Sequence, residues 1–331
     1  MIHCTHDSHG KINMLLLFLL VLQPTALYAW SSDSIHYITN DTVHSPKRFG
    51  TLKPMPTCRR TGYAPPIHLL QLSGNASQRG YAHGFLLGPQ IIDWSVLFLY
   101  KTNMKSNLTY YNFMLREWNK AQFVPREFKL EVEAMYQGMT DAAKASKSNL
   151  FVPEYKRLFN ISDIYLMNAY LEVTPNNSFL TPGPFVGGSR KKGQHEHCSQ
   201  FVFWGDENLT LAGRNMDGEC DDTYITVSHL IVFAISGFNE KRFVSVMWPG
   251  HVGGLSLFNE DGLYMMLNCG STGSGPEQSA TTATSNLTGI EYFMRSIIST
   301  MDENDANPEN VMKHVHRYNS STHGISGMYF L

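Results

Sequence analysis

The sequence predicts an α+β protein in which helices come first, short antiparallel strands follow, and two further helices come after them. Three observations carry this prediction: apolar residues recur at helical spacing between Phe128 and Ala142, short β-rich runs separated by turn residues occupy 199–267, and two amphipathic stretches start at Ile290 and Pro308. Because helices and strands are grouped rather than alternating, layered α+β packing is favoured over a repeated βαβ unit.

The composition is that of a folded protein with a substantial core. The 331 residues suffice for one large domain or two small ones, and 43% of them are hydrophobic. The formal net charge of -2 offers no basic surface to nucleic acid or to an anionic membrane. The sequence therefore predicts no nucleic-acid partner.

The first 29 residues have the pattern of a secretory signal peptide. Lys11 precedes the apolar run Met14–Leu22, and Ala29 offers a small residue for cleavage before Trp30. The apolar run is far shorter than the roughly 20 residues that a membrane span needs. We expect residues 1–29 to be removed, or translation to begin at Met14, and no transmembrane anchor to remain.

Several features predict passage through the secretory route to the outside or to the lysosome. An oxidising compartment permits disulfides, and Cys220 with Cys269 is the candidate pair among the four cysteines after the signal. N-glycosylation sequons mark a glycoprotein of this route. The eight predicted glycosylation sites are Asn40, Asn75, Asn107, Asn160, Asn176, Asn208, Asn286 and Asn319.

The segment 30–197 is predicted to be a mainly helical region. Residues 30–66, rich in Pro and Ser, form an irregular lead-in, and a helix then runs over 77–100 with Ser77 as its N-cap. A third helix over 162–172 has Ser162 as its cap. Between them, Pro125 opens a helix whose buried stripe comprises Phe128, Val132, Met135, Met139 and Ala142.

Residues 174–197 lack periodicity and predict an exposed linker, after which the chain becomes strand-like. Another strand begins at Met328, so the second sheet is expected to be incomplete at the end of this chain. The predicted strands are Ser199–Trp204, Leu209–Arg214, Tyr224–Ser236, Phe243–Trp248 and Leu263–Leu267. One predicted helix carries Ile290, Met294, Ile297 and Met301, and the next starts at Pro308 with Val311, Val315 and Tyr318.

The first two of these strands are predicted to form a hairpin. A four-residue turn after Trp204 pairs Trp204 with Leu209. Cys198 then lies opposite Asn215, or opposite Arg214 if the register slips by one residue. Sequence alone does not choose between the two registers.

In both registers a thiol, a guanidinium and a carboxylate converge at one end of the sheet. If the chain is cut before Cys198, its new α-amine, with a reference pKa of about 7.7–8.0, can take the thiol proton. Arg214 would favour the thiolate and orient the substrate, and Asp217 would hold the α-ammonium. Asn268, which follows a predicted strand, is the candidate donor to an oxyanion.

Three alternatives remain open at this point. Cys198 is an inert buried cysteine, Arg214 and Asp217 are an ordinary ion pair at a strand end, or His195 and His197 bind a metal together with Cys198. The His-x-His-Cys pattern lacks the two separated ligand pairs of structural zinc sites. The sequence therefore predicts no metal and no cofactor.

The residues around Cys198 resemble a known family. His-Cys-Ser-Gln-Phe-Val-Phe-Trp-Gly (197–205) and Leu-Ala-Gly-Arg-Asn-Met-Asp (211–217) are similar to the cysteine branch of the N-terminal-nucleophile (Ntn) hydrolases. They look most like the penicillin acyltransferase-like (acyl-CoA:6-aminopenicillanic acid acyltransferase) family, related to acid ceramidases and choloylglycine hydrolases. In that family the Arg and the Asp follow the nucleophilic Cys by sixteen and nineteen residues, as Arg214 and Asp217 follow Cys198 here.

Other segments extend the resemblance to roughly residues 70–320. Phe-Asn-Glu-Asp-Gly-Leu (258–263) looks like the Asn-Glu-x-Gly-Leu turn of the family, and the oxyanion Asn of the family carries over to Asn268. Segments 79–84 and 164–168 look like the helical region of its acyltransferase-like members. The resemblance implies an αββα sandwich of antiparallel sheets and autocatalytic cleavage between His197 and Cys198.

The expected function follows from this resemblance. We expect an amidohydrolase or acyltransferase that cleaves a linear amide bond, with a small-molecule or lipid amide as substrate. Residues 30–197 would be the propeptide or alpha subunit, and residues 198–331 the Ntn-hydrolase core, or beta subunit, of the processed precursor. The alternative is a catalytically inactive secreted glycoprotein on the same scaffold.

Overall fold

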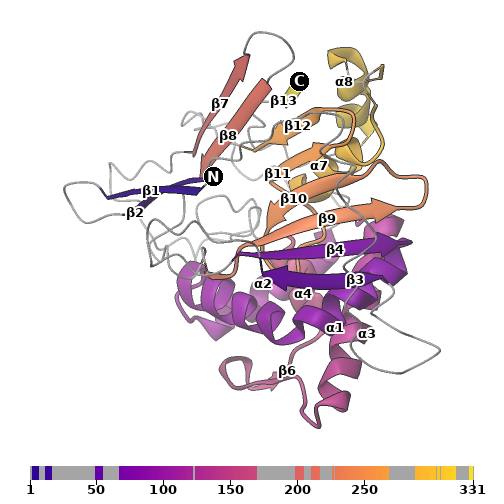
Figure 1. Ribbon diagram of the computed structural model, residues 1–331. Coiled ribbons are helices and arrows are strands. Elements are labelled where there is room, and N and C mark those ends of the chain that lie inside the picture. Colours follow the sequence, from indigo (N-terminus) through magenta and orange to yellow (C-terminus); the bar gives the residue numbers. More distant parts are fainter. Residues whose placement is uncertain are drawn as a thin grey trace.

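The computed structural model describes residues 2–6, 12–16, 49–54, 67–121, 124–169, 198–204, 210–216, 226, 228–267, 288–302, 304–305, 307–317 and 328–330. The described residues form helices, a seven-stranded sheet, a four-stranded sheet and a two-stranded sheet, so the chain is an α+β protein and the predicted class is confirmed (Figure 1). The larger sheet has the strand order β13-β12-β11-β10-β9-β4-β3, and the four-stranded sheet has the order β1-β2-β8-β7.

The N-terminal region contributes two strands that the sequence did not predict. β3 (Gly50–Pro54) pairs antiparallel with β4 (His68–Gly74), and β4 pairs parallel with β9 (Ile231–Gly237). β3 lies within the segment 30–66, which was wrongly predicted to be irregular throughout. The parallel pair also corrects the expectation of purely antiparallel sheets. It is possible because helices intervene between β4 and β9, whereas a short turn joins only antiparallel strands.

The observed N-cap of the first long helix lies two residues before the predicted one. α1 (Ala76–Trp94) has Asn75 as its N-cap, with Oδ1 accepting from the Gln78 amide at 3.0 Å, and the Gln78 side chain accepts from the Asn75 amide. This reciprocal capping box satisfies two backbone donors at the helix start, which Ser77 does not do. The helix continues as the π-helix η4 (Ser95–Asn103).

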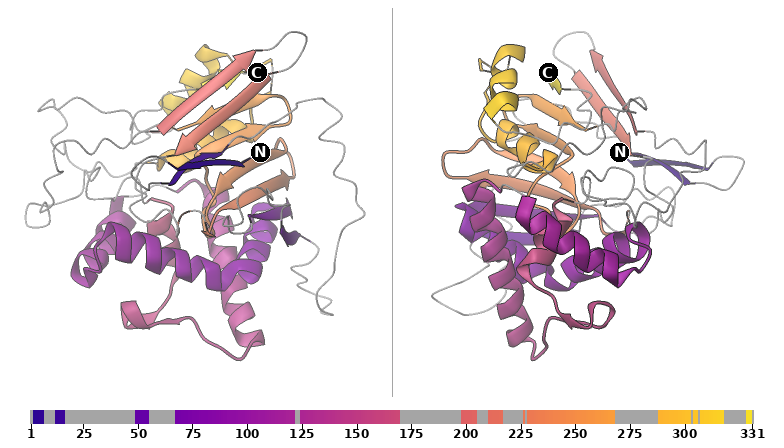
Figure 2. Two further views of the ribbon diagram at one scale, coloured as in Figure 1. Left: turned by 60° about the vertical axis from the view of Figure 1, so that its left-hand side comes forward. Right: turned by 180° about the vertical axis from the view of Figure 1, so that it is seen from behind.

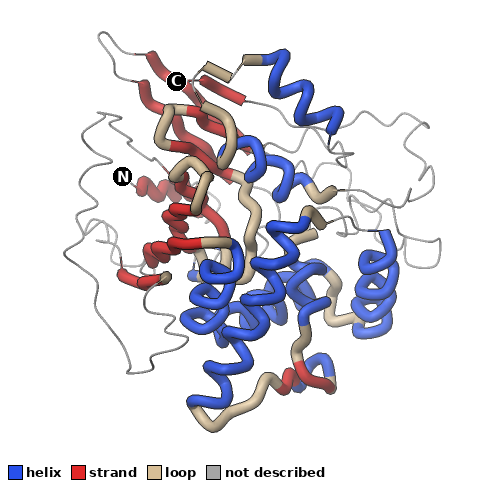
Figure 3. Tube along the Cα trace, turned by 90° about the vertical axis from the view of Figure 1, so that its right-hand side faces the viewer, coloured by secondary structure: helices blue, strands red, loops and turns tan. Residues whose placement is uncertain are grey.

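Among the described residues, this region has three further α-helices, which gather at one end of the molecule below the sheets (Figure 3). α4 begins after Asn160, so the prediction of Ser162 as its cap is wrong. The predicted stripe of α3 is confirmed, except that Ala143 rather than Ala142 is buried. The elements are α2 (Leu108–Ala121), α3 (Arg126–Ala145), β5 (Phe151–Val152), η5 (Pro153–Tyr155), β6 (Arg157–Leu158) and α4 (Ile161–Met167).

Glycines allow α1 and α3 to pack with their backbones in contact. A Cβ atom at Gly80 would meet the Glu131 carbonyl, one at Gly84 the Met135 carbonyl, and one at Gly138 backbone atoms of α1. No side chain fits at these positions without moving a helix. The close crossing fixes α1 against α3 and thereby positions the side chains that both helices send toward the sheets.

The strands after the linker were largely predicted, and the two C-terminal helices are where the sequence placed them. Two corrections apply: β9 begins at Ile231 rather than at Tyr224, and the sequence missed a strand over 256–259. α7 contacts β11 and β12 on one face of the larger sheet, and the β7–β8 hairpin lies on its other side (Figure 2). The elements are β7 (Cys198–Trp204), β8 (Thr210–Met216), β10 (Phe243–Met247), β11 (Ser256–Asn259), β12 (Leu263–Met266), α7 (Ile290–Ile298), α8 (Pro308–Arg317) and β13 (Met328–Phe330).

The predicted turn 258–263 joins β11 to β12 and is organised by one buried side chain. The Asn259 Oδ1 accepts from the Leu263 amide at 3.0 Å, and its Nδ2 donates to the Ile298 and Met301 carbonyls. Gly262 has φ +89°, which favours glycine. The turn therefore anchors the C-terminal end of α7 to the sheet.

The predicted signal segment contains two short strands. β1 (Ile2–His6) pairs with β2 (Ile12–Leu16), and β2 pairs with β8 through Leu15 and Leu16. Removal of residues 1–29 would free that edge of β8. None of the described helices has both the length and the apolar composition that crossing a membrane requires.

Candidate functional site

The β7–β8 hairpin has a register that neither sequence-based alternative anticipated. Trp204 pairs with Thr210 rather than with Leu209, and Cys198 pairs with Met216 rather than with Asn215. Both predicted registers are therefore wrong. The reason is the connection: five residues, 205–209, separate the paired strand ends instead of four.

The observed register places positions 198 and 214 on the same face of the hairpin. Arg214 pairs with Gln200, and successive strand residues alternate between faces, so position 200 shares a face with position 198. Diagonal neighbours of this kind lie roughly 7–8 Å apart. With the predicted Cys198–Asn215 pair, Arg214 would instead have been on the opposite face.

This shared face is the inner one, between the two sheets. Arg214 is 7% exposed and Val202 packs against the core, whereas Phe201 and Phe203 on the other face are 40% and 57% exposed. Because the interior weakens screening, a buried guanidinium acts more strongly on nearby charges than an exposed one.

Arg214 is held by backbone and side-chain acceptors from the larger sheet. Its Nη1 donates to the Leu255 carbonyl at 3.1 Å and to the Ser256 Oγ at 2.8 Å. The same Leu255 carbonyl accepts from the Leu267 amide at 2.9 Å. Leu267 directly precedes Asn268, so one carbonyl links Arg214 to the end of the strand that leads to the predicted oxyanion donor.

The structure describes only part of the predicted site. Asp217, Asn268 and His197 lie outside the described residues, and Cys198 is described only through its place in β7. Cys220 and Cys269, the candidate disulfide, also lie outside. The structure therefore brings together positions 198 and 214. Residue 267 is linked to Arg214 because both donate to the Leu255 carbonyl.

Leu255, whose carbonyl accepts from Arg214, belongs to a loop that is buried along its whole length. Residues 248–255, which we call the buried loop, connect β10 to β11, and every one of them is buried. Loops usually run over the surface, because buried backbone groups need internal partners. Helices of the N-terminal region and α7 supply those partners.

Asn168 and His83 bind the backbone of the buried loop directly. Asn168 Nδ2 donates to the Gly250 carbonyl and its Oδ1 accepts from the Val252 amide, both at 2.8 Å. His83 Nε2 accepts from the Gly250 amide at 3.0 Å. Burial lowers the pKa of His83 to about 3, so the ring is neutral and able to accept this bond.

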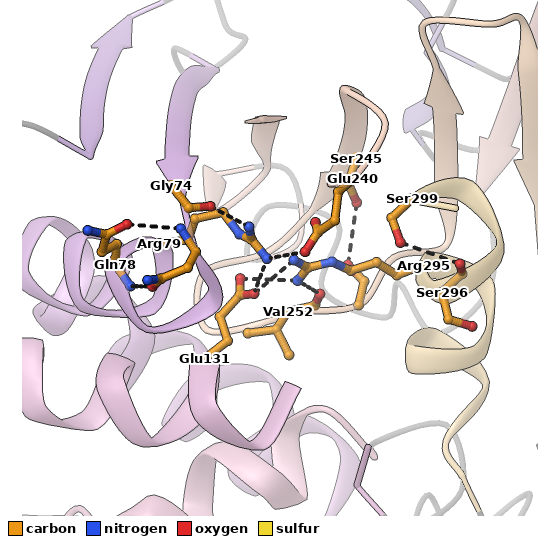
Figure 4. Close-up of polar contacts among 12 residues, drawn as sticks. Gly74, Gln78, Arg79, Glu131, Glu240, Ser245, Val252, Arg295, Ser296 and Ser299 are labelled. Atoms are coloured by element: carbon orange, nitrogen blue, oxygen red, sulfur yellow. Dashed lines mark hydrogen bonds and ion pairs between the residues drawn. The ribbon is translucent and has the colours of Figure 1, made fainter. Parts of the chain in front are cut away.

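A cluster of charged side chains, three of them buried and one partly exposed, lies next to the loop (Figure 4). The arginine–glutamate cluster comprises Arg79, Glu131, Glu240 and Arg295: Glu131 binds Arg79 at 3.2 Å and Arg295 at 2.8 Å, and Arg79 also binds Glu240 at 3.0 Å. Arg295 donates to the Val252 carbonyl. Burial alone would raise the pKa of Glu131, but Arg295 and Arg79 outweigh it and the pKa is lowered.

A histidine of the loop completes the set of contacts. Trp94 Nε1 donates to His251 Nε2 at 3.1 Å, which leaves the proton of a neutral ring on Nδ1, and Nδ1 lies 2.9 Å from Glu291 Oε2. Burial raises the pKa of Glu291 although His251 opposes the shift. These two contacts link α1, the buried loop and α7. No described contact joins them to the hairpin.

One pocket of about 510 Å³ lies elsewhere, between α3, α7 and α8. Arg79, Phe128 and Arg295 are among the described residues that line it, and Arg214 is not. The charged side chains of the arginine–glutamate cluster that line this pocket are Arg79, Glu240 and Arg295. Its described lining therefore does not include Arg214, the member of the predicted site whose side chain the structure describes.

Three predicted glycosylation sites fall within the described residues, each at a helix start. Asn75 and Asn160 are N-caps of α1 and α4, and the Asn107 Oδ1 accepts from the Tyr110 amide at the start of α2. A glycan attaches to Nδ2 and leaves Oδ1 able to accept. The other five sites lie outside the described residues.

Sequence reasoning missed Leu255 and Ser256, the acceptors of Arg214. The available signal was the run from Pro249 to Leu255, which carries three glycines between two apolar strands. Gly253 contacts α7 so closely that a Cβ atom would meet Glu291. Glycines that permit such close approach often mark a packed or functional backbone.

Comparison with known proteins leaves the family open. No family model matches the chain. A protein of Archaeoglobus fulgidus, known only as an uncharacterized protein, is 26% identical over 234 residues. The match covers 65% of this chain and 36% of the relative, so the chain spans about a third of the length of that protein.

Proposed function

We propose that this chain is an N-terminal-nucleophile amidohydrolase or acyltransferase that cleaves a linear amide bond with Cys198, after a cut between His197 and Cys198. The observation that carries the proposal is the hairpin register, which puts positions 198 and 214 on one buried face. The shared Leu255 carbonyl supports it, because it ties Arg214 to the residue before Asn268.

The proposed reaction uses the groups of the chain itself. The freed α-amine of Cys198 takes the thiol proton, and the thiolate attacks the amide carbonyl carbon. The resulting oxyanion is stabilised by the Asn268 amide, and the ammonium returns its proton to the leaving amine as the C–N bond breaks. Water or another acceptor then releases the acyl group from the thioester.

Arg214 and Asp217 have supporting parts in this scheme. The positive charge of Arg214, on the inner face of the hairpin that it shares with position 198, favours the thiolate. Asp217 hydrogen-bonds the α-ammonium and keeps it in place. We further propose the αββα sandwich, of which the α7–sheet–hairpin order would form three layers, and a secreted or lysosomal glycoprotein acting on a small-molecule or lipid amide.

Replacement of the nucleophile tests the proposal. We expect wild-type protein to yield a fragment that begins at Cys198, and Cys198→Ala to stay a single chain, because it lacks the attacking sulfur. Intact mass and N-terminal sequencing of the secreted protein measure this. Ser199→Ala, next to the same bond, is the control and should still be cut.

Cleavage of Cys198→Ala at the same bond would show that another protease makes the cut. A wild-type chain that stays whole and hydrolyses no amide would instead support the inactive glycoprotein. For the active protein, a panel of fluorogenic lipid amides and small N-acyl compounds at acidic and neutral pH separates the two substrate classes.

A further inference from the structure

Both described hydrogen bonds of the Arg214 guanidinium lead outside its own hairpin. Its two described acceptors, the Leu255 carbonyl and the Ser256 Oγ, belong to the end of the buried loop and the start of β11. A guanidinium is a rigid planar fork, so fixing one nitrogen at two acceptors restrains the whole group. The direction of the charge therefore depends on where residues 255 and 256 lie.

Those two residues are in turn fixed by the loop. Asn168 binds two of its backbone groups and donates a further bond to the Ile164 carbonyl at 2.9 Å. Arg295 binds the Val252 carbonyl, and Gly253 lies directly against α7. With partners on both sides, the loop can shift only if several buried hydrogen bonds break.

We propose that the buried loop is a positioning element for Arg214 and that Ser256 is a positioning residue for the thiol reaction. The inference rests on the proposed function. Ser256 touches neither substrate nor nucleophile in this scheme. It acts by holding the Arg214 guanidinium toward the face that position 198 shares.

Ser256 permits a matched pair of variants. Threonine and valine have nearly the same shape, but only threonine keeps a hydroxyl acceptor, and both suit the start of a strand. Ser256→Thr and Ser256→Val thus differ in the bond to Arg214 and in little else. Ser296→Ala, which removes a buried hydroxyl bound to the Phe293 carbonyl, controls for loss of a buried serine.

Two measurements test the inference. We expect Ser256→Val to lower kcat on an amide substrate about tenfold with KM little changed, because misplacing a supporting group slows the chemical step. Peptide-specific alkylation of Cys198 by iodoacetamide, followed against pH, should shift to higher pH in Ser256→Val. Ser256→Thr should restore both, and Ser296→Ala should match wild type.

The outcomes distinguish this inference from the proposed function. Equal kcat and equal alkylation profiles for the valine and threonine variants would overturn the positioning role while leaving an active, Cys198-dependent wild type intact. A wild type whose Cys198 does not react preferentially and which hydrolyses no amide would overturn both. If Ser256→Val does not fold, Ser256→Ala takes its place in the comparison with Ser256→Thr.

Discussion

At the residue scale, His83 is a histidine that the fold keeps uncharged. Burial lowers its pKa from 6.5 to about 3, and its Nε2 accepts from the buried loop. Between these two values the unfolded chain binds a proton that the folded chain does not. Folding stability is therefore lost progressively as pH falls from about 6.5 toward 3, by up to about 1.4 kcal/mol per pH unit.

His83→Gln should flatten this dependence. The glutamine amide oxygen can accept from Gly250 but does not titrate, so the free energy of unfolding should fall less steeply between pH 6.5 and 4 than in wild type. Urea unfolding at a series of pH values measures it. His68→Gln in β4 is the control for removing a histidine, and an unchanged slope in His83→Gln would contradict the assignment.

The spacing of residues in the sequence identified Arg214 as a candidate site residue, but it could not predict the hydrogen-bond acceptors of its guanidinium. The interval from Cys198 to Arg214 is visible in one short stretch of sequence. The contacts of Arg214 with Leu255 and Ser256 join positions about forty residues apart across two sheets. No local pattern encodes such a contact, because it depends on how the sheets stack.

At the element scale, the crossing of α1 and α3 depends on glycine. Gly84→Ala should destabilise the protein by about 1–3 kcal/mol or more, because its Cβ atom would overlap the Met135 carbonyl and push the helices apart. Thermal unfolding of the purified chain measures the loss. Gly88→Ala is the matched control in the same helix, since its nearest neighbours would lie 3.6 Å away and little change is expected.

Helix interiors and the starts of α3 and α8, which prolines mark, were predictable, but the caps of α1 and α4 were not. The period of apolar residues locates α3 and α7, but Ser77 and Ser162 were chosen as caps where Asn75 and Asn160 serve. In each case the asparagine and the serine belong to one Asn-x-Ser triplet, and both types are good caps. Only the geometry decides between them, as it decided the hairpin register through one extra loop residue.

At the scale of the whole molecule, the two predicted subunits share one sheet. β4 lies between β3 and β9, and Arg79 and Glu131 from the first part form the arginine–glutamate cluster with Arg295 from the second. Grouping of helices and strands predicted the α+β class. It could not predict that a strand from residues 68–74 joins the sheet made by residues 231–266.

Cutting the chain in the predicted linker should therefore leave the two parts bound. We expect a chain with an engineered protease site in 174–197 to elute after cleavage as one complex in size-exclusion chromatography. Denaturant should be needed to separate the fragments, because β4 and β9 hold them through backbone hydrogen bonds. Release of the N-terminal fragment in native buffer would indicate a removable propeptide.

The β4–β9 pair also constrains the order of events during synthesis. Its first partners, His68 and Ile231, are 163 positions apart, so the ribosome must finish β9 before the larger sheet can form. Closing so long a connection is entropically costly and makes folding slow. If the proposed cut after His197 came before that moment, it would separate the two halves before β4 and β9 had paired. The proposed activation would therefore have to follow completion of the larger sheet.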